Sequence, residues 1–390
     1  MIVIVLSDRG DAIRHALLSH GWEGDLAAVS AEGSARCAFH VTGIDAQAVE
    51  AMVPVAARFG LDLVTGGDWL IVAGARSRIG AMARPGALPA AFHSLAAAIG
   101  GAIPGERPRR LRHARGVLAL NRPVIVGIMN LTPDSFSDGG TLLSVDAALR
   151  RADDLQTDGA AVIDLGGEST RPGAKPVRTD VECGRVVPVI EAIAKRFPAL
   201  PLSIDTVHAV TADAALGAGA AIINDVTAGR HDPGILAVAA RTGAALVLMH
   251  SRGELGSLAS YQAADYGGDV AGAVTLELRD ALGAAIGAGM AEDAVAVDPG
   301  FGFGKTVPQC FQLLDQLDAV AGLGRPVMVG VSRKRFLGEA AGRPVEDRDR
   351  ATAAACAVAC ERGAALFRVH APAAVRDALA LVSALAEAAV

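Results

Sequence analysis

Polar residues recur along the last two thirds of this 390-residue chain, each at the end of a short apolar run. They are carboxylates, amides and cations, which can hold a polar ligand and stabilise charge that develops in a reaction. They comprise Asn130, Asp164, Asp205, Asn224, Asp225, His250, Asp298, the segment Ser332 to Lys334, Arg368 and His370. One or two would be incidental, but a polar residue after every run indicates a shared ligand site.

The neighbours of these residues suggest different roles. Three alternating glycines and a lysine follow Asp298, which favours contact with a ligand. Asp164 is instead expected to hydrogen-bond to backbone at the end of its strand. His208 and His231 lie in helix or loop context and are expected to be solvated.

Two segments have the composition of long loops. Residues 130–140 read NLTPDSFSDGG and residues 166–173 read GGESTRPG. Such Ser, Asp, Gly and Pro content is typical of exposed loops, and the first segment has the length of a lid over an active site. In the second, Thr170 and Arg171 offer hydrogen-bond donors to an anion, and Pro172 offers a rigid apolar face.

The elements that position these residues follow from the apolar runs, which predict eight strands buried on both faces. The strands are expected at residues 124–130, 161–165, 202–205, 221–224, 245–250, 294–298, 327–332 and 365–370. Helices are expected from Ser144 onward and at about 181–197, 207–217, 233–242, 268–288, 309–321, 347–362 and 372–388. This alternation predicts an α/β fold, a (β/α)8 TIM barrel in which the strand ends ring one face. A doubly wound open sheet has the same alternation and is the alternative.

The first part of the chain has a different character. Residues 1–102 are expected to form a small α+β domain of unknown role. Its strands are predicted at residues 1–6, 37–41, 61–64 and 69–73, and its helices at residues 11–20 and 45–59. Residues 103–116 carry two prolines and five arginines and are predicted to be a linker, or alternatively a strap that docks on the barrel or contacts an anion. The catalytic barrel then spans residues 117–390.

The composition excludes several classes of partner. The formal net charge is −6, whereas a nucleic-acid surface needs a basic excess. No apolar stretch is long enough to predict a membrane span or a signal segment, so the expected location is the cytoplasm. The five cysteines form no C-x-x-C pair and are expected to be free thiols.

Residues 122–390 resemble the dihydropteroate synthase family through seven stretches that stand in the family's order. They read NLTPDSFSDGG, GGESTRPG, SIDT, IND, DPGFGFGKT, SRK and RVH. The resemblance implies an enzyme of folate biosynthesis that joins p-aminobenzoate to a dihydropterin methyl diphosphate and releases pyrophosphate. It also implies Mg²⁺ as cofactor, a homodimer, and competition by sulfonamides with p-aminobenzoate.

The resemblance also implies the roles of individual residues. The expected pterin-binding residues are Asp205, Asn224, Asp298 and Lys334, and the catalytic residues are Asp205, Asp298 and Lys334. The diphosphate is expected at Thr170, Arg368 and His370, with Asn130 as the protein ligand of Mg²⁺. The p-aminobenzoate site is expected to comprise Thr170, Arg171, Pro172, Phe303, Lys334 and Arg335.

Two other functions would use a similar barrel. A pterin-binding methyltransferase that serves a cobalamin protein would share the pterin carboxylates, but it would need neither the first two loops nor a diphosphate site. A non-catalytic paralogue would have lost a residue for diphosphate or Mg²⁺. The chain keeps both loops and all of these residues, which favours the synthase. One departure from the family pattern is Ala371 after His370, where Asp is frequent.

Overall fold

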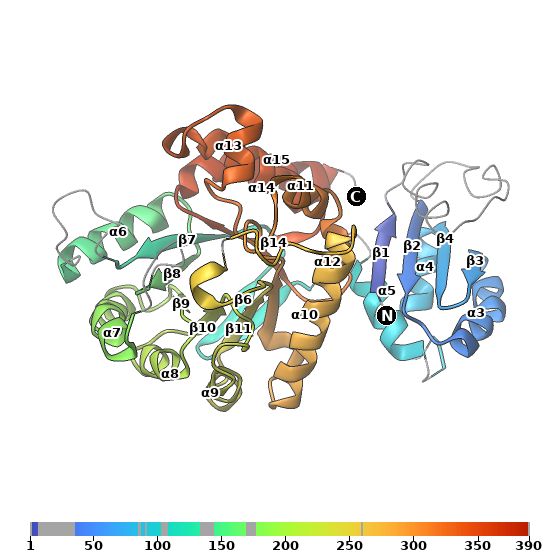
Figure 1. Cartoon of the computed structure of the whole chain (residues 1–390), viewed down its shortest axis with the longest axis horizontal. Helices are drawn as coiled ribbons and strands as arrows, with labels where there is room; N and C mark the ends of the chain where they lie inside the picture. Colours follow the sequence, from blue (N-terminus) through green and yellow to red (C-terminus); the bar gives the residue numbers. More distant parts are fainter. Residues whose placement is uncertain are drawn as a thin grey trace. The chain divides into compact units, whose positions relative to one another are not determined.

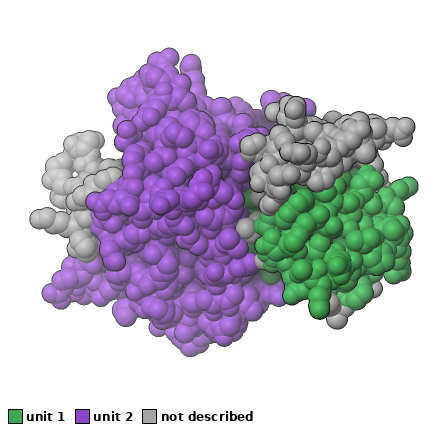
Figure 2. Space-filling view, turned by 45° about the vertical axis from the view of Figure 1, so that its right-hand side comes forward, with its two compact units in different colours: residues 1–108, 318–325 green, residues 109–317, 326–390 purple. Residues whose placement is uncertain are grey.

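The computed structural model of the chain (Figure 1) describes residues 2–6, 36–84, 87–89, 92–102, 108–132, 144–168, 177–258 and 260–388. The chain divides into two compact units, which Figure 2 colours separately. One comprises Met1–Pro108 and Asp318–Arg325, and the other comprises Arg109–Leu317 and Pro326–Val390. Parts of four predicted segments lie outside the described residues, namely residues 11–20, 103–107, 133–140 and 169–173.

The larger unit is built on a closed barrel of eight strands. Each strand pairs in parallel with its neighbour in the chain, and β14 pairs back with β7, for example Phe367 with Ile125. The strands are β7 (Val124–Asn130), β8 (Val162–Gly166), β9 (Leu202–Asp205), β10 (Ile222–Asp225), β11 (Ala245–Met249), β12 (Val295–Asp298), β13 (Val327–Val329) and β14 (Ala364–Val369). All eight strands predicted from the sequence are confirmed. The closure selects the TIM barrel over the open sheet.

Helices surround these strands (Figure 1). They are α6 (Val145–Thr157), α7 (Thr179–Arg196), α8 (Ala209–Gly217), α9 (Gly234–Thr242), α10 (Val270–Gly287), α11 (Val307–Asp315), α13 (Arg335–Ala341), α14 (Asp349–Glu361) and α15 (Pro372–Ala388). The short helix α12 (Leu317–Ala321) follows α11 in the chain, and all but its first residue belong to the smaller unit. Ser144 caps α6 as predicted, because its side chain accepts a hydrogen bond from the Ala147 backbone.

Two differences from the expected helices have local causes. The helix expected over residues 309–321 is two helices, α11 and α12, because Gln316 leaves the helical region at φ −111° and ψ 28°. The short helix α13 was not predicted. It has 7 residues and ends at Gly342, which adopts φ 61°. A helix of two turns is too short to show a clear apolar period. None of the described helices is long and apolar enough to cross a membrane.

The N-terminal ends of the barrel strands are covered by a hairpin of β5 (Arg110–His113) and β6 (Gly116–Ala119). Part of the expected linker is therefore a strand. Leu111 and Leu118 belong to one buried cluster with the strand residues Val124, Ala221 and Ala245. The arginines of the hairpin point elsewhere: Arg112 pairs with Asp293 at 3.0 Å, and Arg115 donates to the Gly219 and Pro198 carbonyls. Within the described part of the expected linker, the strand Arg110–His113 thus packs on the barrel through Leu111.

The smaller unit contains an antiparallel sheet of order β1-β2-β4-β3. Its elements are β1 (Ile2–Leu6), β2 (Arg36–Thr42), β3 (Asp62–Gly66), β4 (Trp69–Ala75), α3 (Ala46–Phe59), α4 (Arg76–Ala83) and α5 (His93–Ala102). The four strands and α3 match the prediction, whereas α4 and α5 were not predicted. Phe39, Met52, Leu70 and Ile99 are fully buried in its own core. An α+β region with a separate core is therefore present.

Candidate active site

A cavity of about 610 Å³ lies within the barrel unit and is lined by the carboxyl ends of its strands. It collects every predicted site residue within the described part of the chain. These residues are Asn130, Asp205, Asn224, Asp298, Phe303, Lys334, Arg335, Arg368 and His370. Thr170, Arg171 and Pro172 lie outside the described residues. Residues up to 240 positions apart in sequence (Asn130 and His370) therefore converge on one space, as parallel strands of a barrel require.

Arg368 occupies the centre of a buried ionic network. Its Nε donates to Asp164 Oδ2 at 2.6 Å, and its Nη2 donates to Asp205 Oδ2 at 2.6 Å. Asn224 Nδ2 also donates to Asp164 Oδ2, at 3.1 Å. The expectation that Asp164 bonds to backbone was wrong, since its partners are the side chains of two predicted site residues. Asp164 therefore positions Arg368 and Asn224.

Two acceptor atoms in this network have no hydrogen-bond partner within the described part of the chain. They are Asp164 Oδ1 and Asn224 Oδ1, and both atoms are buried. A buried acceptor without a donor costs about 1–3 kcal/mol, so such atoms mark a place where a ligand can supply the donor. Asn224 lines the cavity, and its amide oxygen is therefore available to an N–H group bound there.

Burial shifts the acidities of the two predicted catalytic carboxylates. It raises the pKa of Asp205 to about 7, although the Arg368 guanidinium opposes the shift. Burial also raises the pKa of Asp298, while the Gly300 backbone opposes the shift by donating to Asp298 Oδ1 at 2.7 Å. Both carboxyl groups thus lie where a neighbouring cation would be strongly stabilised by their charge.

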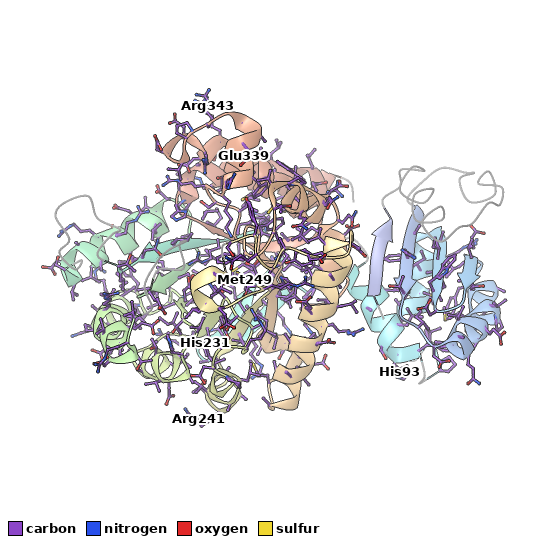
Figure 3. All side chains as sticks on the ribbon, viewed as in Figure 1. His93, His231, Arg241, Met249, Glu339 and Arg343 are labelled. Atoms are coloured by element: carbon purple, nitrogen blue, oxygen red, sulfur yellow. The ribbon has the colours of Figure 1, made fainter. Side chains whose placement is uncertain are left out.

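Lys334 completes this side of the cavity. Its ammonium group contacts the Phe301 carbonyl and lies 4.2 Å from the centre of the Phe303 ring. Burial lowers the pKa of Lys334 to about 8, although Asp298 opposes the shift. The remaining predicted cation, Arg335, is more exposed and pairs with Glu339 at 2.6 Å. Figure 3 shows Met249 inside the barrel unit, with Glu339 and Arg343 on its outer surface near α13.

Lys305 is a residue whose role the sequence did not reveal. Its side chain is fully buried, and Nζ donates to the Gly300 and Phe303 carbonyls at 3.0 Å each. Nζ also lies 2.9 Å from His250 Nδ1. Burial lowers the pKa of Lys305 to about 7. Lys305 therefore holds the loop after β12 in shape.

Glycine is required within this loop. Gly300 adopts φ +69°, and a Cβ there would lie 1.8 Å from the His250 carbonyl oxygen. The glycines after Asp298 consequently allow the loop to pass close to the barrel wall. Any other residue at position 300 would have to push the backbone of β11 or the loop aside.

His370 is oriented by a residue that was not assigned a role from the sequence. The Ser332 hydroxyl lies 3.0 Å from His370 Nδ1 and accepts from the His370 backbone at 3.2 Å. Arg151 donates to the His370 carbonyl at 3.1 Å. Ser332 thereby fixes both the backbone and the ring of the histidine.

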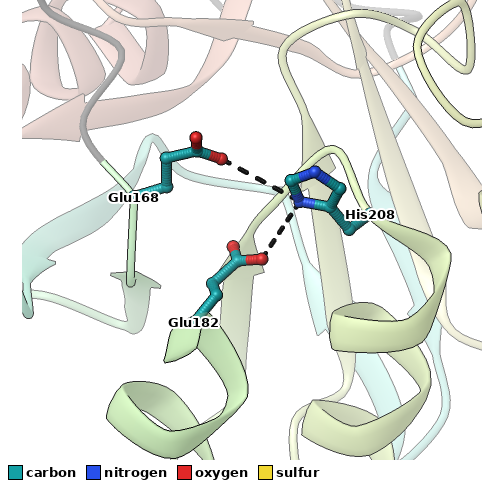
Figure 4. A group of neighbouring side chains, drawn as sticks. All are labelled: Glu168, Glu182 and His208. Atoms are coloured by element: carbon teal, nitrogen blue, oxygen red, sulfur yellow. Dashed lines mark hydrogen bonds and ion pairs between the residues drawn. The ribbon is translucent and has the colours of Figure 1, made fainter. Parts of the chain in front are cut away.

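Two places among the described residues could hold a metal ion. Asn130 ends β7, is half-buried and lines the cavity, where its amide oxygen is a suitable single protein ligand for Mg²⁺. A second group, Glu168, Glu182 and His208, lies at the ends of β8 and the starts of α7 and α8 (Figure 4). The expectation that His208 is solvated was wrong, because its side chain is 16% exposed and pairs with Glu182 at 3.1 Å.

A barrel whose cavity contains acids, an amide and cations is typical of enzymes that bind a polar heterocycle. Residues 126–370 match the family described as "Pterin binding enzyme". The dihydropteroate synthase of Bacillus subtilis (strain 168) is 42% identical over 249 residues, which are 64% of this chain and 84% of that protein.

Solved structures agree with this match. Xanthomonas albilineans dihydropteroate synthase with 4-aminobenzoic acid has 44% sequence identity and a TM-score of 0.66, covering 72% of this chain and 98% of that one. The same enzyme in complex with 7,8-dihydropteroate has 41% identity and a TM-score of 0.62, covering 70% and 98%. The chain belongs to the dihydropteroate synthase family. The family match begins at residue 126, so residues 1–108 of the smaller unit lie outside it, whereas its residues 318–325 lie within it.

Proposed function

We propose that the chain condenses p-aminobenzoate with (7,8-dihydropterin-6-yl)methyl diphosphate to give 7,8-dihydropteroate and pyrophosphate. The observation that carries this proposal is the composition of one cavity: the partly buried Asp205 and the buried acceptors Asn224 and Asp298 share it with the cations Lys334 and Arg368. A pterin presents N–H donors, and a diphosphate requires positive charge. The cavity supplies both.

The pterin ring is proposed to bind against the buried acceptors. Asn224 Oδ1 lacks a donor among the described residues, and a ring N–H or the exocyclic amino group would supply one. Asp298 Oδ1 is occupied by the Gly300 backbone, which leaves Oδ2 for a second donor. Carboxylates and amides are efficient at such pairing, because each oxygen can accept N–H bonds side by side.

The reaction is proposed to be dissociative. The bond between the pterin methylene carbon and the diphosphate oxygen breaks first, and the electron pair leaves with pyrophosphate. The carboxylates of Asp205 and Asp298 then stabilise the cationic methylene. The neutral arylamine nitrogen attacks this carbon and loses one proton to solvent. An aniline is nucleophilic at neutral pH, so no strong general base is needed.

Arg368 is proposed to have two functions. Its contacts with Asp164 and Asp205 keep Asp205 ionised, because the guanidinium opposes the rise in pKa caused by burial. It also contributes positive charge, together with Lys334, to the departing pyrophosphate, and the Ser332-oriented His370 offers a ring N–H to the same group. Mg²⁺ bound at the Asn130 amide oxygen would add Lewis-acid stabilisation of the leaving group.

The p-aminobenzoate is proposed to lie beside Phe303, Lys334 and Arg335, with Thr170, Arg171 and Pro172 completing its site. The Lys334 ammonium already lies against the face of the Phe303 ring, and Arg335 is the more exposed cation of the pair. An aromatic face and a nearby cation suit a benzoate. We also propose that the protein acts in the cytoplasm as a homodimer, which light scattering of the purified chain would test.

A coupled assay for pyrophosphate tests the proposed reaction. We expect release that requires both the pterin diphosphate and p-aminobenzoate, and that falls when Mg²⁺ is chelated. A sulfonamide should raise the KM for p-aminobenzoate without lowering kcat. Absence of turnover by the folded protein with Mg²⁺ would contradict the proposal. Pterin binding without turnover would identify a binding protein or a methyltransferase barrel instead.

A further inference from the structure

A second cluster of ligating side chains lies beside the active-site cavity and has no part in the reaction proposed above. It consists of Glu168, just after β8, Glu182 in α7, and His208, which precedes α8 (Figure 4). One ligand atom from each residue lies within 4.8 Å of the others. Glu168 also lines the cavity.

Glu182 is the residue that most needs a partner. Its side chain has no exposed surface. Oε2 accepts from Thr211 Oγ1 at 2.6 Å and lies 3.1 Å from His208 Nδ1. Oε1 is buried, and no donor from the described residues reaches it. A buried carboxylate is costly unless a cation compensates it, and Figure 4 shows this one directed toward Glu168 and His208.

In Glu168, likewise, one carboxylate oxygen accepts a hydrogen bond and the other faces His208. Glu168 Oε1 accepts from the Val177 backbone at 2.9 Å, which leaves Oε2 facing His208 Nδ1 at 3.9 Å. That distance is too long for a hydrogen bond. A protonated His208 has a single proton on Nδ1, and the 3.1 Å contact directs it to Glu182 Oε2. An imidazolium therefore leaves Glu182 Oε1 without a donor among the described residues, and leaves Glu168 Oε2 only the ion pair at 3.9 Å.

We propose that Glu168, Glu182 and His208 bind a divalent transition-metal ion, for which Zn²⁺ best suits one imidazole nitrogen and two carboxylates. A tetrahedral ion with bonds of about 2.1 Å separates its ligands by about 3.4 Å. His208 Nδ1 lies 3.1 Å from Glu182 Oε2 and 3.9 Å from Glu168 Oε2, one distance below that value and one above it. The Thr211 hydroxyl and the Val177 backbone orient the carboxylates from outside.

This site differs from the proposed Mg²⁺ site in its donors. Asn130 offers one amide oxygen, which suits a hard ion held mainly by phosphate and water. The cluster offers nitrogen and carboxylate ligands from the protein itself, which favour Zn²⁺ over Mg²⁺. The ion would link the end of β8 to the starts of α7 and α8, at the base of the GGESTRPG segment.

Calorimetric titration of the full chain with Zn²⁺, after treatment with a chelator and removal of any affinity tag, tests the proposal. We expect the unmodified chain to bind one more Zn²⁺ than His208→Ala or Glu182→Gln. Each variant should weaken that site by more than about 100-fold, because even the loss of an outer partner costs about 10–100-fold. Glu168→Gln provides a second carboxylate variant in case the buried Glu182→Gln protein does not fold.

Two matched controls accompany the titration. His231→Ala removes a ring that lies edge-on to His208 at 5.3 Å but contributes no ligand, and it should leave affinity within about threefold. Asn130→Ala removes the proposed Mg²⁺ ligand and should also leave Zn²⁺ binding unchanged. In crystals soaked with Zn²⁺, anomalous scattering should place the ion about 2.0–2.2 Å from atoms of all three residues.

Equal Zn²⁺ binding by the unmodified chain and His208→Ala would overturn the proposal. So would a failure of the unmodified chain to bind Zn²⁺ below about 1 mM, equivalent to a binding free energy of about −4 kcal/mol. In either case His208 would serve as a protonated ion-pair partner of Glu182 only. None of these readouts depends on turnover, so they stand apart from the test of the proposed reaction.

Discussion

The two ends of the barrel carry opposite kinds of residue, although the same eight strands reach both. At the carboxyl ends, the charged residues Asp205, Asp298 and Arg368 line a cavity, alongside apolar residues such as Met249 and Phe303. At the other end, Leu111 and Leu118 of the β5–β6 hairpin pack on small and branched apolar residues. The difference shows that residues suited to catalysis lie at one end of the barrel and residues that stabilise the fold lie at the other, as is general for this architecture.

Lys334→Ala should have the largest effect on turnover. It removes a cation that lies beside Phe303 and faces Asp298, so kcat/KM should fall about 1,000-fold, or about 4 kcal/mol. Steady-state kinetics would measure the loss, and thermal unfolding should be nearly unchanged. Arg343→Ala, which alters a cation on the outer surface after α13, is the matched control. Near-normal turnover of Lys334→Ala would show that the strand ends are not the reactive end.

Asp164→Asn should have the next largest effect. It weakens the hold on Arg368 and leaves that guanidinium paired with Asp205 alone, so kcat/KM should fall on the order of 100-fold. Breaking a buried ion pair should also lower the free energy of unfolding by about 3 kcal/mol. Urea unfolding and steady-state kinetics would measure both effects.

The control for Asp164→Asn is Asp213→Asn. That variant breaks the exposed ion pair with Arg241 at 2.7 Å. It should change neither kcat/KM nor the free energy of unfolding measurably. If the two variants behaved alike, the buried network around Arg368 would not contribute to catalysis.

The pH dependence of kcat/KM should have two limbs. Asp205 must be ionised to stabilise the cation, so activity should fall about tenfold for each pH unit below its pKa of about 7. Lys334 must be protonated, so activity should also fall above its pKa of about 8. Asp205→Asn should shift the acid limb and keep the alkaline limb, because Asp298, whose pKa burial also raises, must still be ionised. An unchanged acid limb in that variant would assign it to another group.

Leu111→Ala should have the smallest effect on turnover and a large effect on stability. Leu111 is fully buried, and truncation of such a leucine costs about 3 kcal/mol in the free energy of unfolding. The rate should change less than about threefold, because the hairpin lies at the end away from the cavity. Val117→Ala, at a 58% exposed position in the same hairpin, should cost about 0.5 kcal/mol or less. A large loss of turnover in Leu111→Ala would break the distinction between the two ends.

Much of this arrangement could be predicted from the sequence, for physical reasons. The barrel strands are largely apolar runs with polar residues in or near their carboxyl ends, so both the strands and Asp205, Asn224 and Asp298 were evident. The hairpin was not, because arginines surround Leu111 and hide the alternation of apolar residues. Helix α13 is too short for its periodicity to be seen.

The parts of the site that the sequence did not reveal depend on contacts between distant residues. Asp164 bonds to Arg368 across 204 positions, and Lys305 approaches His250 across 55. Neither partner can be identified from local spacing. His208 was expected to be solvated, and only the fold brings Glu182 to it. The residue types indicated the chemistry, whereas the pairing required the structure.

A crystal structure of the protein with the pterin diphosphate and Mg²⁺ tests the central claim most directly. We expect the pterin ring to bond with Asp205, Asn224 and Asp298, and the diphosphate to lie toward Asn130 and His370. A pterin bound elsewhere on the barrel, or bound with its diphosphate against the buried carboxylates, would contradict the account.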